Sequence, residues 1–134
     1  MLERELIQAT GFHNIGPEGA REGFAIRLRL PNYHGTRLSH LDGVDVTVDG
    51  EFFGHEHNRL AIRDDVYTLD QLREAVDARW EIFEPASILV ARPGGLSPGI
   101  HEVAVTARVR YNYFPPDMHV FPVRGQRLAT IVLP

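Results

Sequence analysis

Apolar and polar residues alternate along most of this chain. Residues 24–30, 44–48 and 101–113 each place apolar side chains at every second position, which is the pattern of a strand buried on one face. Shorter segments with the same period predict further strands at 60–62, 87–91 and 127–133. Asp49-Gly50 follows one of the alternating runs and favours a tight hairpin, because both positions of such a turn adopt positive φ. The pattern predicts a largely antiparallel β protein.

One segment departs from this period and predicts a short helix over 69–78. Thr68 and Gln71 have the spacing of a capping box, and apolar residues then recur at helical spacing. Several short strands with frequent turns and a single helix are typical of a sandwich. We therefore expect an all-β fold, a two-sheet antiparallel β-sandwich of immunoglobulin-like type with one short helix. We expect one domain spanning residues 1–134.

The composition excludes several classes of chemistry. The 134 residues include no cysteine, and all 14 basic residues are arginine, which rules out thiol nucleophiles, thiolate metal sites, disulfides and lysine Schiff bases. None of the three serines, Ser39, Ser87 and Ser97, lies in a Gly-x-Ser-x-Gly motif. With 18 acidic residues the net charge is −4, which disfavours nucleic-acid binding.

The same sequence predicts a cytoplasmic protein that binds no membrane. No apolar run approaches the roughly 20 residues that a membrane helix needs. The charged start Met1-Leu2-Glu3-Arg4-Glu5 lacks the apolar core of a secretion signal. The absence of cysteine agrees with a reducing compartment.

A predicted loop carries the densest group of side chains suited to binding. Pro31, Asn32, Tyr33 and His34 follow the 24–30 strand, and Arg37 comes shortly after. Aromatic and polar loop residues are typical of binding surfaces. Tyr33 fits a lid over the core edge equally well, and both interpretations stay open.

Trp80 is the only tryptophan, and two interpretations apply to it. Its large apolar area favours a place in the core or at the core edge. The other interpretation makes it an interface anchor or a platform on which a sugar stacks. The neighbouring Glu81 and Glu84 have no accompanying nucleophile or base, so we do not expect a catalytic acid/base pair there.

His55 and His57 are the local candidates for a metal site, since residues two apart on a strand share a face. No third ligand stands nearby, and the pair also fits a solvated hairpin strand. We therefore expect no metal on this chain. The alternative is a small metalloenzyme that recruits His34 or His101 as a distant third ligand.

Four arginines alternate with apolar residues and are expected on the outward faces of strands. They form two sequence pairs, Arg27 with Arg29 and Arg108 with Arg110. Solvated charge that discourages edge pairing is the ordinary explanation. A partner surface follows only if the two pairs are neighbours in space.

A set of short motifs follows in a fixed order between residues 11 and 113. The motifs are Gly11-Phe12-x-Asn14, Arg29-Leu30-Pro31-x-Tyr33-x-Gly35-x-x-Leu38-Ser39, Val46-x-Val48-Asp49-Gly50, Tyr67-Thr68-Leu69-Asp70, Trp80-Glu81 and Pro93-Gly94-Gly95-Leu96-x-Pro98-Gly99-x-His101. Their ordered succession resembles the small (β) subunit of bacterial C-glycoside deglycosidases. His55, His57 and the residues after Pro116 lie outside the matched pattern.

The resemblance implies a non-catalytic β-sandwich subunit that pairs with a larger (β/α)₈-barrel α subunit. The substrate of such a carbon–carbon lyase is a 3-keto C-glycoside, for example one derived from a flavonoid C-glucoside, and enolisation followed by elimination releases the aglycone. The catalytic residues and a divalent metal, manganese, belong to the barrel subunit. This chain would carry no catalytic residue and no cofactor, and would be inactive alone. We expect the following residues to face the partner or the substrate mouth: Pro31, Asn32, Tyr33, His34, Arg37 and Trp80.

The alternative function is a stand-alone carbohydrate-binding β-sandwich module. Such a module needs an exposed aromatic platform, for which Trp80, Tyr111 and Tyr113 are the candidates. Tyr111 is in phase with the apolar face of the 101–113 run, so we expect it to be buried. These modules are also usually secreted, and the sequence shows no secretion signal.

Overall fold

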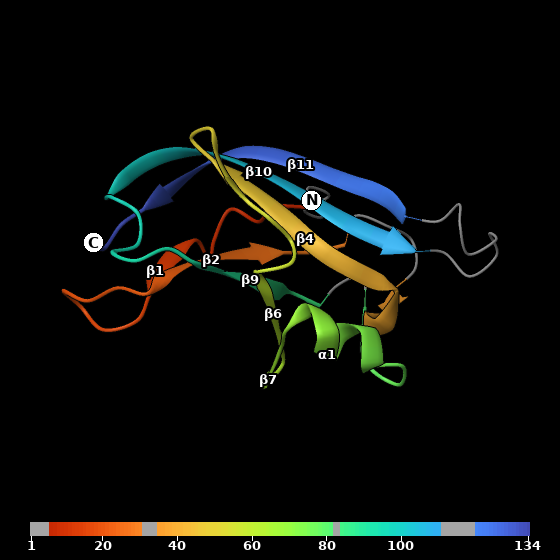
Figure 1. Cartoon of the computed structure of the whole chain (residues 1–134). Helices are drawn as coiled ribbons and strands as arrows, with labels where there is room; N and C mark the ends of the chain where they lie inside the picture. The colour runs from red at the N-terminus through yellow and green to blue at the C-terminus, as the bar shows by residue number, and fades with distance from the viewer. Residues whose placement is uncertain (1–5, 31–34, 82–83, 111–119) are drawn as a thin grey trace.

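The computed structural model describes residues 6–30, 35–81, 84–110 and 120–134. Two antiparallel sheets pack face to face (Figure 1). The first has five strands in the order β1 (His13–Ile15), β2 (Gly23–Leu28), β9 (Ala86–Ala91), β6 (Arg59–Ile62) and β7 (Asp65–Tyr67). The second has four strands in the order β11 (Val120–Ile131), β10 (Gly99–Arg110), β4 (Leu41–Val48) and β5 (Glu51–Phe53). A two-stranded sheet pairs β3 (Thr36–Arg37) with β8 (Arg79–Trp80).

The core lies between the two large sheets and follows the alternation of the sequence. On β2, Phe24, Ile26 and Leu28 are fully buried, whereas Arg27 between them is exposed. On the other sheet, Val46 of β4 pairs with Val105 of β10, and both side chains point inward. The predicted all-β antiparallel sandwich with one short helix is confirmed.

The Asp49-Gly50 hairpin is also confirmed. It joins β4 to β5, with Val48 paired to Glu51. Asp49 has φ 49° and Gly50 has φ 86°, so both turn residues lie in the left-handed region. This turn places the Asp49 carboxylate at the end of the sandwich where β10 begins.

The helix α1 (Leu69–Glu74) is shorter than the predicted 69–78. Its capping box is present, with Gln71 N donating to Thr68 Oγ1 at 3.3 Å and Thr68 N donating to the Gln71 side chain at 2.9 Å. The backbone leaves helical geometry at Ala75 (ψ 65°), so Val76 no longer shares the buried face and is exposed. Besides α1, a single 3₁₀ turn, η1 (Leu38–His40), precedes β4. Among the described residues, no helix has the length and apolar character needed to cross a lipid bilayer.

The last strand begins earlier than predicted. β11 runs from Val120, not from Arg127, and pairs with β10 over twelve residues of each strand. Pro122 and Gly125 obscure it in the sequence, since both are poor strand formers. Proline is tolerated here because β11 is an edge strand, where a missing N–H need not break a ladder. Tyr111 and Tyr113, predicted to extend the preceding strand, lie outside the described residues.

Candidate functional site

Three of the sequence motifs, those with Asn14, Asp49 and His101, meet at the end of the sandwich where β10 begins. Asn14 Oδ1 accepts the backbone N–H of Leu96 at 2.7 Å, and its Nδ2 donates to the carbonyls of Leu96 at 2.9 Å and Leu133 at 3.3 Å. Gly95 has φ 68°, and a Cβ there would lie 2.5 Å from Asn14 Oδ1. Asn14 thus ties β1, the loop before β10 and the residues after β11 together.

His101 forms the second contact of this end. Its Nδ1 lies 2.6 Å from Asp49 Oδ2, and its Nε2 lies 2.7 Å from the carbonyl oxygen of Ser97. Both partners are acceptors, so both ring nitrogens must donate, which requires the imidazolium cation. The ring is buried and packs edge-on against Phe12.

The electrostatics agree with this charged state. Burial alone lowers the pKa of His101, but the hydrogen bonds to Ser97 and Asp49 outweigh it, and the pKa is raised above its ordinary value. The pKa of Asp49 is lowered, first by the hydrogen bond from His101 and then by the backbone N–H of Glu102. With both nitrogens donating, His101 presents no lone pair to a metal, which excludes it as the distant third ligand.

A depression of about 240 Å³ lies beside this ion pair. Arg92 and Glu51 line it, and the Nη2 of Arg92 lies 3.2 Å from Glu51 Oε1. Arg92 also donates to the carbonyl oxygen of Gly95. The charged groups of this depression therefore form ion pairs and hydrogen bonds with one another. These contacts stabilise the loop before β10.

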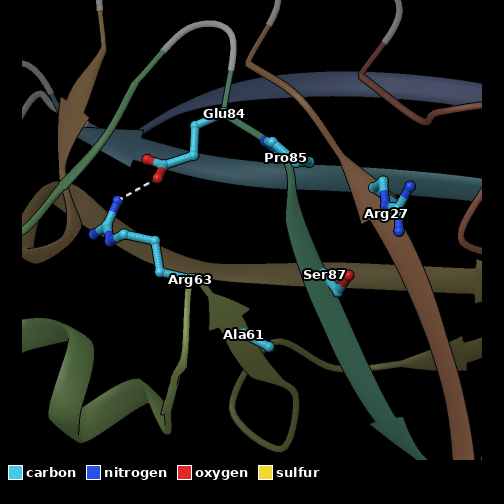
Figure 2. A pocket seen from close by; sticks show the side chains of 6 residues that line it. All are labelled: Arg27, Ala61, Arg63, Glu84, Pro85 and Ser87. Atoms are coloured by element: carbon cyan, nitrogen blue, oxygen red, sulfur yellow. Dashed lines mark hydrogen bonds and ion pairs between the residues drawn. The ribbon is translucent and has the colours of Figure 1, made fainter.

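A larger groove of about 380 Å³ crosses the outer face of the five-stranded sheet (Figure 2). Arg27 of β2 stands on one side, and Arg63 and Glu84 point toward each other on the other. Arg63 Nη1 lies 2.5 Å from Glu84 Oε2, and its Nη2 donates to the Arg79 carbonyl at 3.1 Å. The Glu84 carboxylate accepts this hydrogen bond from Arg63, and the same hydrogen bond raises the pKa of Arg63. The groove floor, Ala61 and Ser87, offers one hydroxyl.

The two glutamates at this position do not form a pair of carboxylates that could exchange a proton. The Glu81 carboxylate accepts a hydrogen bond from Arg79 Nε at 2.8 Å, whereas Glu84 pairs with Arg63. Each negative charge thus has its own guanidinium partner. The arrangement suits local stabilisation rather than proton transfer.

A metal site at His55 and His57 requires an extended strand that places both rings on one face, and the structure does not meet this condition. Both lie in a turn, in which His57 N donates to the carbonyl of Gly54 and Asn58 N to that of His55. His55 Nδ1 lies 2.8 Å from Asp45 Oδ1, and His57 is largely exposed. In the described ranges, no three histidines, aspartates or glutamates are arranged to hold a metal ion. The residues there do not fit a metal centre.

The loop predicted to face a partner lies in part outside the described residues, which exclude Pro31, Asn32, Tyr33 and His34. On either side of these four residues, Leu30 is buried in the core and Thr36 pairs with Trp80. A Cβ on Gly35 would lie 2.7 Å from the Trp80 carbonyl oxygen, so only glycine fits this approach. Arg37 is exposed beside this pair.

Trp80 itself is fully buried, and its indole Nε1 donates to the Glu84 carbonyl at 2.7 Å. The core interpretation therefore holds, and the expectation that Trp80 faces a partner is corrected. The ring is equally unavailable as a sugar-stacking platform. The other two platform candidates, Tyr111 and Tyr113, lie outside the described residues.

The two arginine pairs lie on different sheets and do not form a joint surface. Arg27 and Arg29 belong to β2 and the residues directly after it, whereas Arg108 belongs to β10. Arg29 and Arg108 are half-buried, and the Nε atom of each is buried without a hydrogen-bond partner. Of the three arginines of this set whose side chains are described, only Arg27 is exposed as a solvated strand face requires.

A surface that the sequence prediction did not single out is the outer face of the four-stranded sheet. Phe52, Ile100 and Leu128 are each exposed there. The sequence itself contains the evidence for this surface. Ile100 lies on the same strand face as the polar Glu102, and Leu128 lies on the same strand face as Gln126. Bulky apolar residues on the polar phase of a strand indicate a contact surface.

Comparisons with known proteins give one consistent result. The family model described as "C-glycoside deglycosidase beta subunit" matches residues 2–113. The chain is 31% identical to a C-glycoside deglycosidase beta subunit of Eubacterium cellulosolvens, over 86% of this chain and 79% of that protein. It is 35% identical to a 3'-dehydrocarminate deglycosidase beta subunit of a Microbacterium species, over 69% and 70% of the two chains. It is 27% identical to an Arthrobacter globiformis C-glycoside deglycosidase beta subunit, over 81% of each.

Proposed function

Because this chain belongs to the C-glycoside deglycosidase beta subunit family, we propose that it is the non-catalytic small subunit of a heteromeric carbon–carbon lyase. The family match over residues 2–113 is the observation that carries this proposal. A beta subunit implies a companion subunit in the complex. The companion we propose is a larger (β/α)₈-barrel subunit that carries the catalytic groups.

The ion pairs of the side chains described above agree with a non-catalytic role for this chain. The carboxylates of the two depressions are each engaged: Asp49 with His101, Glu51 with Arg92, and Glu84 with Arg63. A general acid or base needs a group that can reach a substrate and exchange its proton. The divalent metal expected for such enzymes, manganese, is accordingly assigned to the companion subunit, since the part of this chain that the structure describes holds no cluster that fits it.

The proposed substrate is a C-glycoside already oxidised to the 3-keto sugar, such as a flavonoid 3-keto C-glucoside. The ketone acidifies the neighbouring C2 proton, and removal of that proton gives an enolate. The enolate electrons then form the C1–C2 double bond as the C1–aryl bond breaks. The aryl carbon takes a proton, so the products are the free aglycone and an unsaturated keto sugar.

Within this assembly, the loop between Leu30 and Arg37 is proposed to face the companion or its active-site mouth. The buried Leu30 and the Thr36–Trp80 pairing anchor both ends of this loop. Substituting Tyr33 or His34 by alanine is expected to weaken assembly or turnover. If both variants assemble and turn over like the wild type, this placement is wrong.

The proposed function is tested by reconstitution. This chain, the companion subunit and their equimolar mixture are each incubated with a 3-keto C-glucoside, and the released aglycone is quantified by chromatography. We expect no release by this chain alone and release by the mixture. Turnover by the isolated chain, or a mixture no more active than the companion alone, would contradict the proposal.

A further inference from the structure

We propose that this chain docks its companion subunit through the outer face of the four-stranded sheet. We call this surface the docking face and define it by the outward residues of β5, β4, β10 and β11. The inference rests on the function proposed above and adds the location of the contact. The argument begins with the difference between the two outer faces of the sandwich.

The docking face carries the large exposed apolar side chains. Ile100 is 71% exposed and Leu128 is 63% exposed. Since Ile100 pairs with Thr130 and Leu128 with Glu102, the two aliphatic residues are diagonal neighbours on the same face. Val132, directly after β11, is also exposed. Neighbouring exposed aliphatic side chains of this kind favour an interaction site.

The middle of the docking face bears Thr47 and Ala104 on its two central strands. The register aligns Phe52, Thr47, Ala104 and Gln126 in one row across the four strands. Phe52 is 64% exposed at the β5 edge of this row. Among the described residues, no helix or strand lies over this face (Figure 1), and the turn after β5 contacts it where His55 meets Asp45. A sheet face without a helix or strand over it suits another protein surface better than a small molecule, which needs a concave site.

The size of the docking face matches a stable subunit contact. β10 and β11 have twelve residues each, β4 has eight and β5 has three. At about 3.4 Å per residue and 4.8 Å per strand, the face projects about 570 Å². A standard interface buries about 800 Å² of accessible surface on each partner, and side-chain relief makes accessible area larger than projected area. A companion subunit seated on this face would therefore form a contact of about standard size.

The opposite outer face has fewer exposed large apolar side chains among the described residues. One row across the five-stranded sheet contains His13, Ala25, Leu89 and Arg59, and the next contains Arg27, Ser87, Ala61 and Val66. The groove of Figure 2 crosses this face. Both faces carry charged side chains, which on the docking face are Asp45, Glu102, Arg108 and Arg124, so charge does not distinguish them. Val66, 47% exposed on the edge strand β7, is its large exposed aliphatic residue and provides a matched control.

The test compares binding of the separately purified companion subunit, measured by calorimetry, to five forms of this chain. The forms are the wild type, Leu128→Arg, Ile100→Arg, the double variant and Val66→Arg. We expect each single docking-face variant to raise Kd about tenfold and the double about a hundredfold. Val66→Arg should stay within about twofold of the wild type. Saturating amounts of a docking-face variant should restore the wild-type rate of aglycone release.

Circular dichroism and thermal unfolding check that each variant is folded. Should an arginine variant unfold, Leu128→Gln and Ile100→Thr, which resemble their outward neighbours, take its place. The docking face would be refuted, and the proposed function left standing, by either of two results. One is that the docking-face variants bind the companion like the wild type. The other is that Val66→Arg raises Kd as much as they do. A wild-type chain that binds no companion overturns the proposed function as well. A homodimer that Leu128→Arg dissociates, with companion binding unchanged, would assign the face to a second copy.

Discussion

His101 Nδ1 lies 2.6 Å from Asp49 Oδ2 and links two residues 52 positions apart in the sequence. The Asp49 side belongs to the β4–β5 turn, and the His101 side to the start of β10. Because the imidazolium form is required, the stability of this end depends on pH.

The first prediction concerns that dependence. The raised pKa of His101 stabilises the fold below about pH 6.5, and this contribution is lost as pH rises through the folded-state pKa. The lowered pKa of Asp49 stabilises the fold above about pH 3.8, and this contribution is lost as pH falls through the folded-state value. The melting temperature should therefore peak between these limits. His101→Gln should lower that peak and flatten the decline at higher pH.

Thermal unfolding by circular dichroism across pH 3 to 9, in a constant ionic strength, measures this profile. His57→Gln is the matched control, because His57 is largely exposed. The control should follow the wild-type profile. A His101→Gln profile parallel to that of the wild type at every pH would contradict the assignment.

The second prediction concerns Asn14. Replacing it by alanine removes three hydrogen bonds and leaves the backbone N–H of Leu96 without its acceptor. We expect Asn14→Ala to lower the free energy of unfolding by about 1–3 kcal/mol, measured by urea denaturation. Asn14→Asp should be at least as damaging, since a carboxylate would face two carbonyl oxygens. Gln126→Ala, at an exposed position, should change little, and equal losses for Gln126→Ala and Asn14→Ala would refute the argument.

The third prediction concerns backbone strain at Arg63, which has φ 55°. Arg63→Ala and Arg63→Gly both lose the contact with Glu84. Glycine also relieves the left-handed strain that alanine retains. We expect the glycine variant to be more stable than the alanine variant by about 1 kcal/mol in urea denaturation. An alanine variant as stable as the glycine variant would show that no strain is present.

The fourth prediction concerns Trp80, the sole tryptophan. A buried indole should emit at shorter wavelength than in the unfolded chain and resist quenching by iodide. Adding the companion subunit should leave this emission unchanged. Trp80→Phe should cost about 1–3 kcal/mol, because the Glu84 carbonyl loses its donor and a void forms. Efficient iodide quenching of the folded chain would be incompatible with the structure.

The alternation of side chains was sufficient to predict the sandwich, but not the ends of its elements. Val76 fits a helical period, yet the backbone turns away at Ala75, a local dihedral choice that apolar spacing does not encode. β11 was obscured by Pro122, which is acceptable only because the strand lies at an edge. Edge position is a property of the assembled sheet. The β3–β8 pair has two residues in each strand, too few for any period to be detected.

The candidate site was less predictable because its contacts join distant segments. The sequence contains Asp49 in a turn and His101 near a strand start, and only the β4–β10 register brings them together. Trp80 could be given two roles from the sequence, and burial decided between them. At His55 and His57, sequence spacing suggested a proximity that the structure does not contain. Residues two apart share a face only on an extended strand, and these two lie in a turn.

The exposed apolar side chains on the outer face of the four-stranded sheet affect how the protein behaves in a cell. A copy synthesised without its companion would leave Ile100 and Leu128 in contact with water. Unassembled copies should aggregate or be degraded by proteases. The amount of complex that accumulates would therefore depend on synthesis of the two subunits in matched amounts. Expression of this gene product alone, followed by measurement of its half-life with and without the companion, would reveal that dependence.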